Sequence, residues 1–191
     1  MENTLEMRIE ASFSLNFLVY IQNIYINQNQ NKDQLKFPYI AFKYGFPKDF
    51  EKRYRELWSE ISKRVSSEHP INDIFNEEKN IIYQSLFTED DVTLNEFEEI
   101  YLSFKVWWNS LAGRFSIERS IDAPLDEVYR LFANLLIEKR IKPKKSLDIS
   151  LIYDECLLGD IKPTFYFSIF TIDDWFINRK KLIPKLQLSI H

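Results

Sequence analysis

Residues 5–17, LEMRIEASFSLNF, alternate between apolar and polar side chains without a break. All odd-numbered positions are apolar and all even-numbered positions are polar, so a strand would place the two sets on opposite faces. One buried face and one solvated face are typical of an antiparallel sheet. We therefore expect the chain to begin with a strand of such a sheet, and residues 18–26 to continue it or to bend into a second strand.

Strand-like composition returns on both sides of a long central region. Residues 37–44 are rich in aromatic side chains, and Pro38 near their start favours an edge strand or the beginning of a strand. Residues 147–153, 165–169 and 186–190 alternate again towards the C-terminus. The polar stretch at residues 27–34, NQNQNKDQ, has nothing to bury, and we interpret it as an exposed loop.

Four amphipathic helices are predicted between these strands, at residues 47–65, 73–87, 93–112 and 124–140. Thr93 and Glu96 form a capping-box pattern at the start of the third helix, and Gly113 follows its last apolar turn, where a left-handed C-cap favours glycine. Asp122 or Ala123 would cap the fourth helix. This order predicts an α+β fold, in which an antiparallel sheet built from N- and C-terminal strands packs against four central helices within a single domain, residues 1–191.

The composition excludes several classes of enzyme. The chain has 191 residues but only three glycines, and these are too far apart for a P-loop or a dinucleotide-binding motif. One cysteine and two histidines are too few for a multi-cysteine zinc site or for schemes that use several histidines. His69 precedes a proline in a surface loop, and Cys156 follows two acids, so we expect neither to be catalytic. We expect no cofactor and no bound metal.

The charge and the apolar runs predict the compartment. The formal net charge is -4, and the longest apolar run, residues 17–21, is far too short to span a bilayer. The first six residues are acidic and have no apolar core, so we expect no signal peptide and a location in the reducing cytoplasm. The acidic balance argues against general nucleic-acid binding, because neutralising phosphates supplies most non-specific affinity.

Two charged segments are candidate binding surfaces. Residues 89–99 hold six acids and no base, but lack the loop pattern of a calcium site, so we interpret them as a solvated face that could meet a basic partner. Residues 139–145 hold five cations, which either stabilise a helix C-terminus or contact nucleic acid or an acidic protein, although no aromatic stacking partner lies in this segment. The acids are Glu89, Asp90, Asp91, Glu96, Glu98 and Glu99, and the cations are Lys139, Arg140, Lys142, Lys144 and Lys145.

Adjacent tryptophans, Trp107 and Trp108, raise the question of an interface. Neighbouring side chains on a helix point about 100° apart, so one core does not easily bury both from one side. Either the helix is buried nearly all round, which we favour, or Trp107 helps to form a binding surface, where tryptophan is enriched. Residues 173–176, DDWF, raise the same question.

An alternative hypothesis comes from Asp148, which is followed twelve residues later by Asp160 and then by Lys162. This spacing resembles the D…(D/E)-x-K pattern of the restriction-endonuclease-like family. The resemblance implies a metal-dependent hydrolase, in which the two acids hold the metal while the lysine supports an attacking water.

The absence of catalytic motifs leads to a first hypothesis of a small non-catalytic protein that binds another protein. Regulatory, inhibitor and immunity-type proteins belong to this class, and the acidic segment would suit blocking a basic active site. The sequence leaves open whether the chain forms a homo-oligomer. The alternatives are the metal-dependent hydrolase and a nucleic-acid-binding module centred on residues 139–145.

Overall fold

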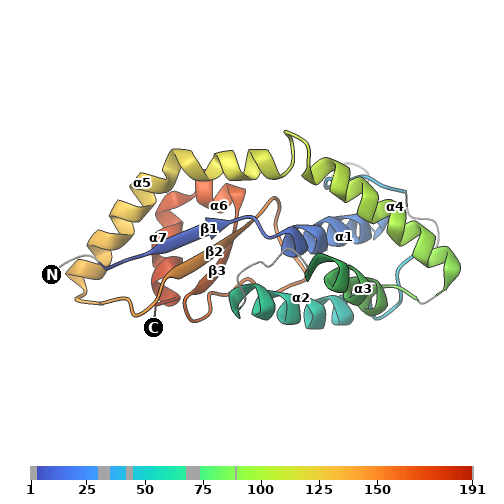
Figure 1. Ribbon diagram of the computed structural model, residues 1–191, viewed down its shortest axis with the longest axis horizontal. Coiled ribbons are helices and arrows are strands. Elements are labelled where there is room, and N and C mark those ends of the chain that lie inside the picture. Colours follow the sequence, from blue (N-terminus) through green and yellow to red (C-terminus); the bar gives the residue numbers. More distant parts are fainter. Residues whose placement is uncertain (1–3, 30–34, 42–44, 68–73, 89, 191) are drawn as a thin grey trace. The chain divides into compact units, whose positions relative to one another are not determined.

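The computed structural model describes residues 4–29, 35–41, 45–67, 74–88 and 90–190. This part of the chain contains seven helices and three strands (Figure 1). Its contacts divide into two compact units. Unit 1 comprises Met1–Ser12, Ser110–Glu155 and Ile161–His191, and unit 2 comprises Phe13–Asn109 and Cys156–Asp160. The chain passes between the units four times, and the single domain expected from the sequence stays a prediction.

Unit 1 holds a three-stranded sheet and three helices (Figure 1). The strand order is β1 (Met7–Glu10), β2 (Leu147–Ile152) and β3 (Phe167–Thr171), with β2 in the centre. The helices α5 (Arg114–Glu138), α6 (Ile172–Phe176) and α7 (Arg179–Leu188) pack against one another. Ser168 of β3 shares a hydrogen bond with Ser189, so the turn just after α7 lies against β3.

Both strand pairs are parallel, which contradicts the antiparallel sheet expected from the sequence. Residues 153–166 return the chain to the edge where β2 begins, so β3 runs in the same direction as β2. On β2, Ile149 and Leu151 are buried on one face, and Ser150 and Ile152 on the other. Burial on both faces is typical of a parallel strand, whereas an alternating sequence does not reveal the direction of the neighbouring strand.

Two of the predicted strands are partly helical. Within residues 5–17 only Met7–Glu10 is a strand, because α1 (Phe13–Asn29) begins three residues later. Residues 186–190 belong to α7 and the turn after it. Residues 35–41 form no strand, and residues 30–34 and 42–44 lie outside the described residues. The predictions at residues 147–153 and 165–169 correspond to β2 and β3.

Unit 2 is built from helices (Figure 1). After α1 come α2 (Phe50–Ser67), α3 (Ile74–Leu86) and α4 (Asp91–Trp108), and the first two agree with the helices predicted at residues 47–65 and 73–87. On α2, the buried residues Tyr54, Leu57, Trp58 and Ile61 follow the spacing of one helix face.

The predicted ends of α4 and the predicted start of α5 are wrong. Asp90 is the N-cap of α4 and accepts hydrogen bonds from the backbone N–H groups of Val92 and Thr93, so Thr93 lies inside the helix rather than at its cap. Asn109 is the C-cap of α4, and Gly113 instead precedes α5.

The second of these helices, α5, begins ten residues before the predicted start and contains Pro124, so neither Asp122 nor Ala123 caps it. Pro124 removes one helical hydrogen bond, but the buried face formed by Ile117, Ile121, Val128 and Phe132 continues across it.

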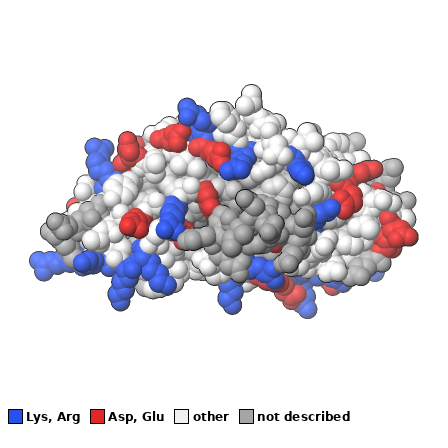
Figure 2. Space-filling view, in the orientation of Figure 1, with Lys and Arg blue, Asp and Glu red and all other residues white. Residues whose placement is uncertain are grey.

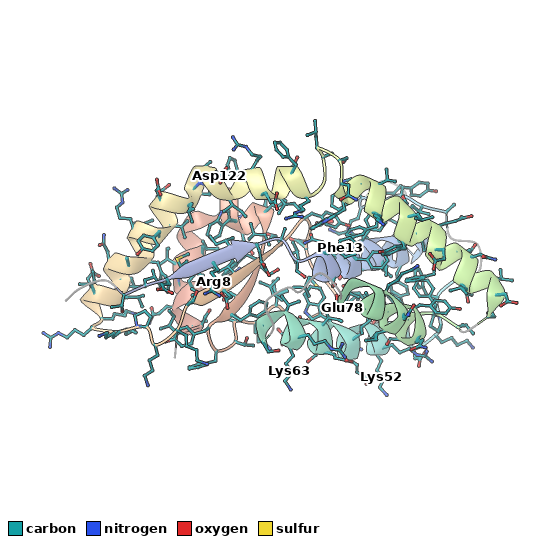
Figure 3. All side chains as sticks on the ribbon, in the orientation of Figure 1. Arg8, Phe13, Lys52, Lys63, Glu78 and Asp122 are labelled. Carbon is teal, nitrogen blue, oxygen red and sulfur yellow. The ribbon has the colours of Figure 1, made fainter. Side chains whose placement is uncertain are left out.

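Burial on all sides distinguishes α1 from the other helices. Every residue from 14 to 24 is buried, including the polar side chains of Asn16, Gln22 and Asn23. Ser14 donates a hydrogen bond to the buried carboxylate of Glu78, near the start of α3 (Figure 3). A helix without a polar face has no amphipathic signature, which explains why its sequence did not predict it.

The amide side chains of α1 hold two non-helical segments of unit 2. Gln22 Oε1 accepts hydrogen bonds from the N–H groups of Leu157 and Leu158, at 2.7 and 3.0 Å. Asn27 Oδ1 accepts from the Lys36 N–H at 2.8 Å, while its Nδ2 donates to the carbonyls of Lys36 and Pro38 at 2.7 and 2.9 Å. These bonds fix residues 36–38 and 157–158 against the same helix.

The loop at residues 156–160 also packs tightly on α2. Trp58 Nε1 donates to the Asp160 carbonyl at 2.8 Å, and Tyr54 Oη lies 3.8 Å from Cys156 Sγ. A Cβ atom at Gly159 would lie 2.5 Å from Trp58 Cγ and 2.7 Å from Cys156 Sγ. Only glycine therefore fits between this indole ring and the thiol.

Asn27→Asp should destabilise the fold. The substitution keeps an acceptor for Lys36 N–H but replaces the NH₂ donor by a charged oxygen that faces two carbonyl oxygens. We expect the free energy of unfolding to fall by about 2–4 kcal/mol, measured by urea denaturation. The control, Asn80→Asp, places the same charge on an exposed position of α3 and should change stability by less than about 0.5 kcal/mol. Equal loss in both variants would show that the Asn27 bonds contribute nothing.

Gly159→Ala should lower the free energy of unfolding by about 1–3 kcal/mol, because the added methyl group overlaps Trp58 and Cys156. Leu157→Ala serves as the control, since it alters an exposed side chain in the same loop. Urea denaturation of both variants measures the difference. A Gly159→Ala protein as stable as wild type would contradict the packing described for this loop.

Candidate functional site

Large apolar side chains stand exposed on the outer side of α4. Phe97, Ile100, Phe104 and Trp108 face the core of unit 2. On the opposite side of the helix, Leu102 is 55% exposed and Val106 is 74% exposed. Leu102 and Val106 are four residues apart, so they lie side by side on consecutive turns.

Trp107 connects α4 to the segment at residues 35–41. Its ring centroid lies 5.3 Å from that of Phe37 and 6.0 Å from that of Tyr20 of α1. Trp107 is half-buried and Trp108 is buried, so the two neighbours divide between a surface and the core. Phe37 is 50% exposed and Tyr39 is 66% exposed, which extends the apolar surface beyond the helix. We call the exposed set Phe37, Tyr39, Leu102 and Val106, with Trp107 and Glu99, the α4 surface.

The predicted acids of α4 differ in their surroundings. Glu98 pairs with Lys79 of α3, whose ammonium lies 4.6 Å from the centre of the Tyr101 ring. Glu96 is half-buried, whereas Glu99 is exposed and has no ion pair or hydrogen bond within the described residues. Glu96, Glu99 and Trp107 lie on one flank of the helix, because their spacing follows three- and four-residue steps. Glu89 lies outside the described residues.

The five cations predicted as a candidate site gather in the turn between α5 and β2. Lys139, Arg140, Lys142, Lys144 and Lys145 are all exposed, and we call them the basic cluster. Figure 2 shows Lys and Arg side chains gathered over this turn and Asp and Glu side chains over the first part of α4. Within each unit, one charge sign therefore dominates a local surface.

An aromatic ring lies beside the basic cluster, although the sequence around the cluster holds none. Lys145 Nζ lies 5.7 Å from the centre of the Phe165 ring, which belongs to the loop before β3. The Lys144 N–H donates to Tyr166 Oη at 2.6 Å, and this bond joins the two loops. Sequence reasoning missed Phe165 because twenty residues separate it from Lys145.

Cys156 is half-buried, and the pKa of its thiol is raised. Burial raises its pKa to about 11, and this effect outweighs the opposing hydrogen bond with Tyr54. A nucleophilic cysteine needs a lowered pKa instead. His69 and His191 lie outside the described residues.

The residues of the hydrolase hypothesis belong to different parts of the fold. Asp148 lies on β2 in unit 1, where its Oδ1 is buried with no hydrogen-bond partner among the described residues. Asp160 belongs to unit 2, and its carbonyl accepts the Trp58 hydrogen bond. Lys162 is exposed in the loop before β3, not on a strand. The described residues contain no group of three or more His, Cys, Asp or Glu side chains that could hold a metal, so this hypothesis gains no support from them.

The chain matches no protein-family model, and comparisons with curated proteins and with solved structures give no match. Among the helices of the described part, none has the length and apolar content needed to cross a membrane. Function is therefore inferred from the surfaces described above.

Cys156 should react slowly with Ellman's reagent in the native protein. A pKa near 11 rather than 9.0 leaves about 100-fold less thiolate at pH 8. The native rate should rise about tenfold per pH unit up to pH 10, and full unfolding in guanidinium chloride should restore the rate of an ordinary thiol. Because the folded pKa is the higher one, this thiol favours the folded state below pH 9 and loses that contribution as pH rises towards 11. Equal native and unfolded rates at pH 8 would contradict the burial.

Proposed function

We propose that this chain acts without catalysis, by binding another protein through the α4 surface of unit 2, and that the partner presents basic and apolar side chains. The observation that carries the proposal is the pair Leu102 and Val106, which are more than half exposed on a helix whose opposite side forms the core. Exposed apolar patches rimmed by polar groups are typical of protein interaction sites.

Trp107 joins α4 to the aromatic segment at residues 35–41. Phe37 contacts Trp107, and the backbone around Phe37 is fixed by the amide groups of Asn23 and Asn27. The segment is thus held in place before a partner arrives, which reduces the entropy that binding would cost. Phe37 and Tyr39 supply large, rigid side chains of the kind enriched at interface cores.

The charge of the surface favours a basic partner. Glu99 lies one turn before Ser103 and two turns before Trp107 and Val106, and no described cation pairs with it. Asp91, at the start of α4, is exposed as well. Acids beside an apolar patch attract a basic partner and accelerate association, while the apolar contacts slow dissociation. This combination would suit an inhibitor- or immunity-type protein that covers a basic active site.

Leu102→Ser combined with Val106→Ser should abolish partner binding while leaving the fold intact. Both side chains are exposed, so we expect stability to change by less than about 0.5 kcal/mol for each substitution. The measurement begins with affinity capture from a nuclease-treated native lysate and identification of the retained chain. The purified partner is then titrated against wild type and variant by calorimetry.

The matched control is Ile177→Ser, which removes an apolar side chain that is 69% exposed on unit 1. It should bind like wild type, and Glu99→Lys should weaken association most strongly at low salt. A captured chain that binds the double variant and wild type equally well, or one that carries no basic surface, would overturn the proposal.

A further inference from the structure

Three segments of unit 1 meet at the basic cluster. The turn after α5 carries the five cations, the loop before β3 carries Phe165 and Tyr166, and the end of α7 carries Gln187 and Ser189. Tyr166 joins all three, because its hydroxyl accepts the Lys144 N–H and its own N–H donates to the Ser189 carbonyl at 2.7 Å. Lys139 Nζ also donates to Gln187 Oε1 at 2.7 Å. The cations therefore lie on segments that hydrogen bonds hold together, not on an unbonded tail.

No carboxylate of the described chain pairs with any cation of the basic cluster. By contrast, Arg53, Arg64 and Arg114 each form an ion pair with an acid four residues away in the sequence. Cations left without counter-ions on one exposed turn create a local positive potential that attracts anionic ligands.

Phe165 supplies a flat apolar surface within this potential. Its ring is 60% exposed, and the edge-on contact with Tyr166, at 4.7 Å between centroids, holds its position. Lys145 lies near the same ring. An exposed aromatic ring among cations combines the two elements that bind single strands, since bases stack on the ring while phosphates meet the cations.

Backbone strain is concentrated at the same place. Arg140 and Tyr166 have φ values of 55° and 58°, and they are the only non-glycine residues with positive φ in the described chain. Arg140 occupies the position after the C-cap of α5, where the Ile141 N–H bonds to the Leu136 carbonyl across the turn. Glycine is favoured at such a position, so the turn holds an arginine at an energetic cost.

We propose that the basic cluster and Phe165 form a binding site for single-stranded nucleic acid, with one base stacked on the Phe165 ring and successive phosphates on the cations. The site contacts phosphate, sugar and the face of a base, so it binds without strong sequence preference. An unpaired base is required because the bases of a duplex are already stacked on one another and cannot cover Phe165. The site belongs to unit 1, and it does not depend on the function proposed for the α4 surface of unit 2.

Fluorescence anisotropy with labelled dT15 and rU15 tests this site. We expect micromolar affinity at low salt and a slope of log K against log salt of about −3, since each phosphate contact contributes about −0.7 for single strands. The oligonucleotide that binds more tightly shows whether the site prefers DNA or RNA. A 15-base-pair duplex and inorganic polyphosphate serve as competitors, and both should compete at least tenfold less well than dT15 per phosphate.

Three variants separate stacking, charge and folding. Phe165→Ala should weaken dT15 binding by about tenfold, whereas Phe165→Trp should retain it. Lys144→Gln combined with Lys145→Gln should reduce the salt slope by about 1.4. Arg140→Gly removes a charge but relieves the positive φ, so it should weaken binding without lowering Tm.

Matched controls are Lys63→Gln, which removes an exposed cation from α2, and the Leu102/Val106 double variant, and both should bind dT15 like wild type. No binding at 100 µM protein in low salt would overturn the proposal. Equal binding of polyphosphate and dT15, together with an inert Phe165→Ala, would also overturn it, since this result would show general attraction of anions without a base-stacking site.

Discussion

The burial of residues 14–24 on every side of α1 is the constraint on which unit 2 depends. A buried polar group must keep its hydrogen bonds, because leaving one unsatisfied costs about 1–3 kcal/mol. The amide side chains of Gln22, Asn23 and Asn27 meet this requirement by bonding to backbone groups of non-helical segments. Each segment gains partners that a strand neighbour would otherwise supply. The helix thus fixes residues 157–158 and residues 36–38, and the second segment carries Phe37 of the α4 surface.

The same constraint explains where sequence reasoning fails. Hydrophobic periodicity identifies an element that has one buried and one solvated side. Hydrophobic periodicity works for α2, whose charged side faces water, and it fails for α1, most of whose polar residues are buried. In residues 11–17 the period of two continues from β1 into the helix, because Ser12, Ser14 and Asn16 are polar although Ser14 and Asn16 are buried. Composition alone does not distinguish a polar side chain in water from one bonded in a core.

The sequence pattern of a strand does not determine the direction in which it runs relative to its neighbours. β1 and β2 are separated in the sequence by residues 11–146, and their register, Ile9 opposite Ile149, is set by packing across this distance. The two candidate sites also differ in whether the sequence could predict them. Helical spacing places Glu96, Glu99 and Trp107 on one flank of α4, and this placement could be predicted. The contact between Lys145 and Phe165 could not, because it requires the β2–β3 loop to return to the turn after α5.

The two residues of unit 1 with a strained backbone, Tyr166 and Arg140, have different explanations. Tyr166 is accounted for by packing, since it is buried and its hydroxyl and N–H both bond to neighbouring segments. Arg140 differs, because the turn explains its backbone conformation but not its side chain, which is exposed and makes no ion pair with the described residues. Glycine at position 140 would end α5 with roughly 1 kcal/mol less backbone strain, because it adopts the left-handed conformation without the steric cost of a Cβ atom. The fold therefore does not explain the charge at Arg140, whereas an anionic ligand bound at the basic cluster would explain it.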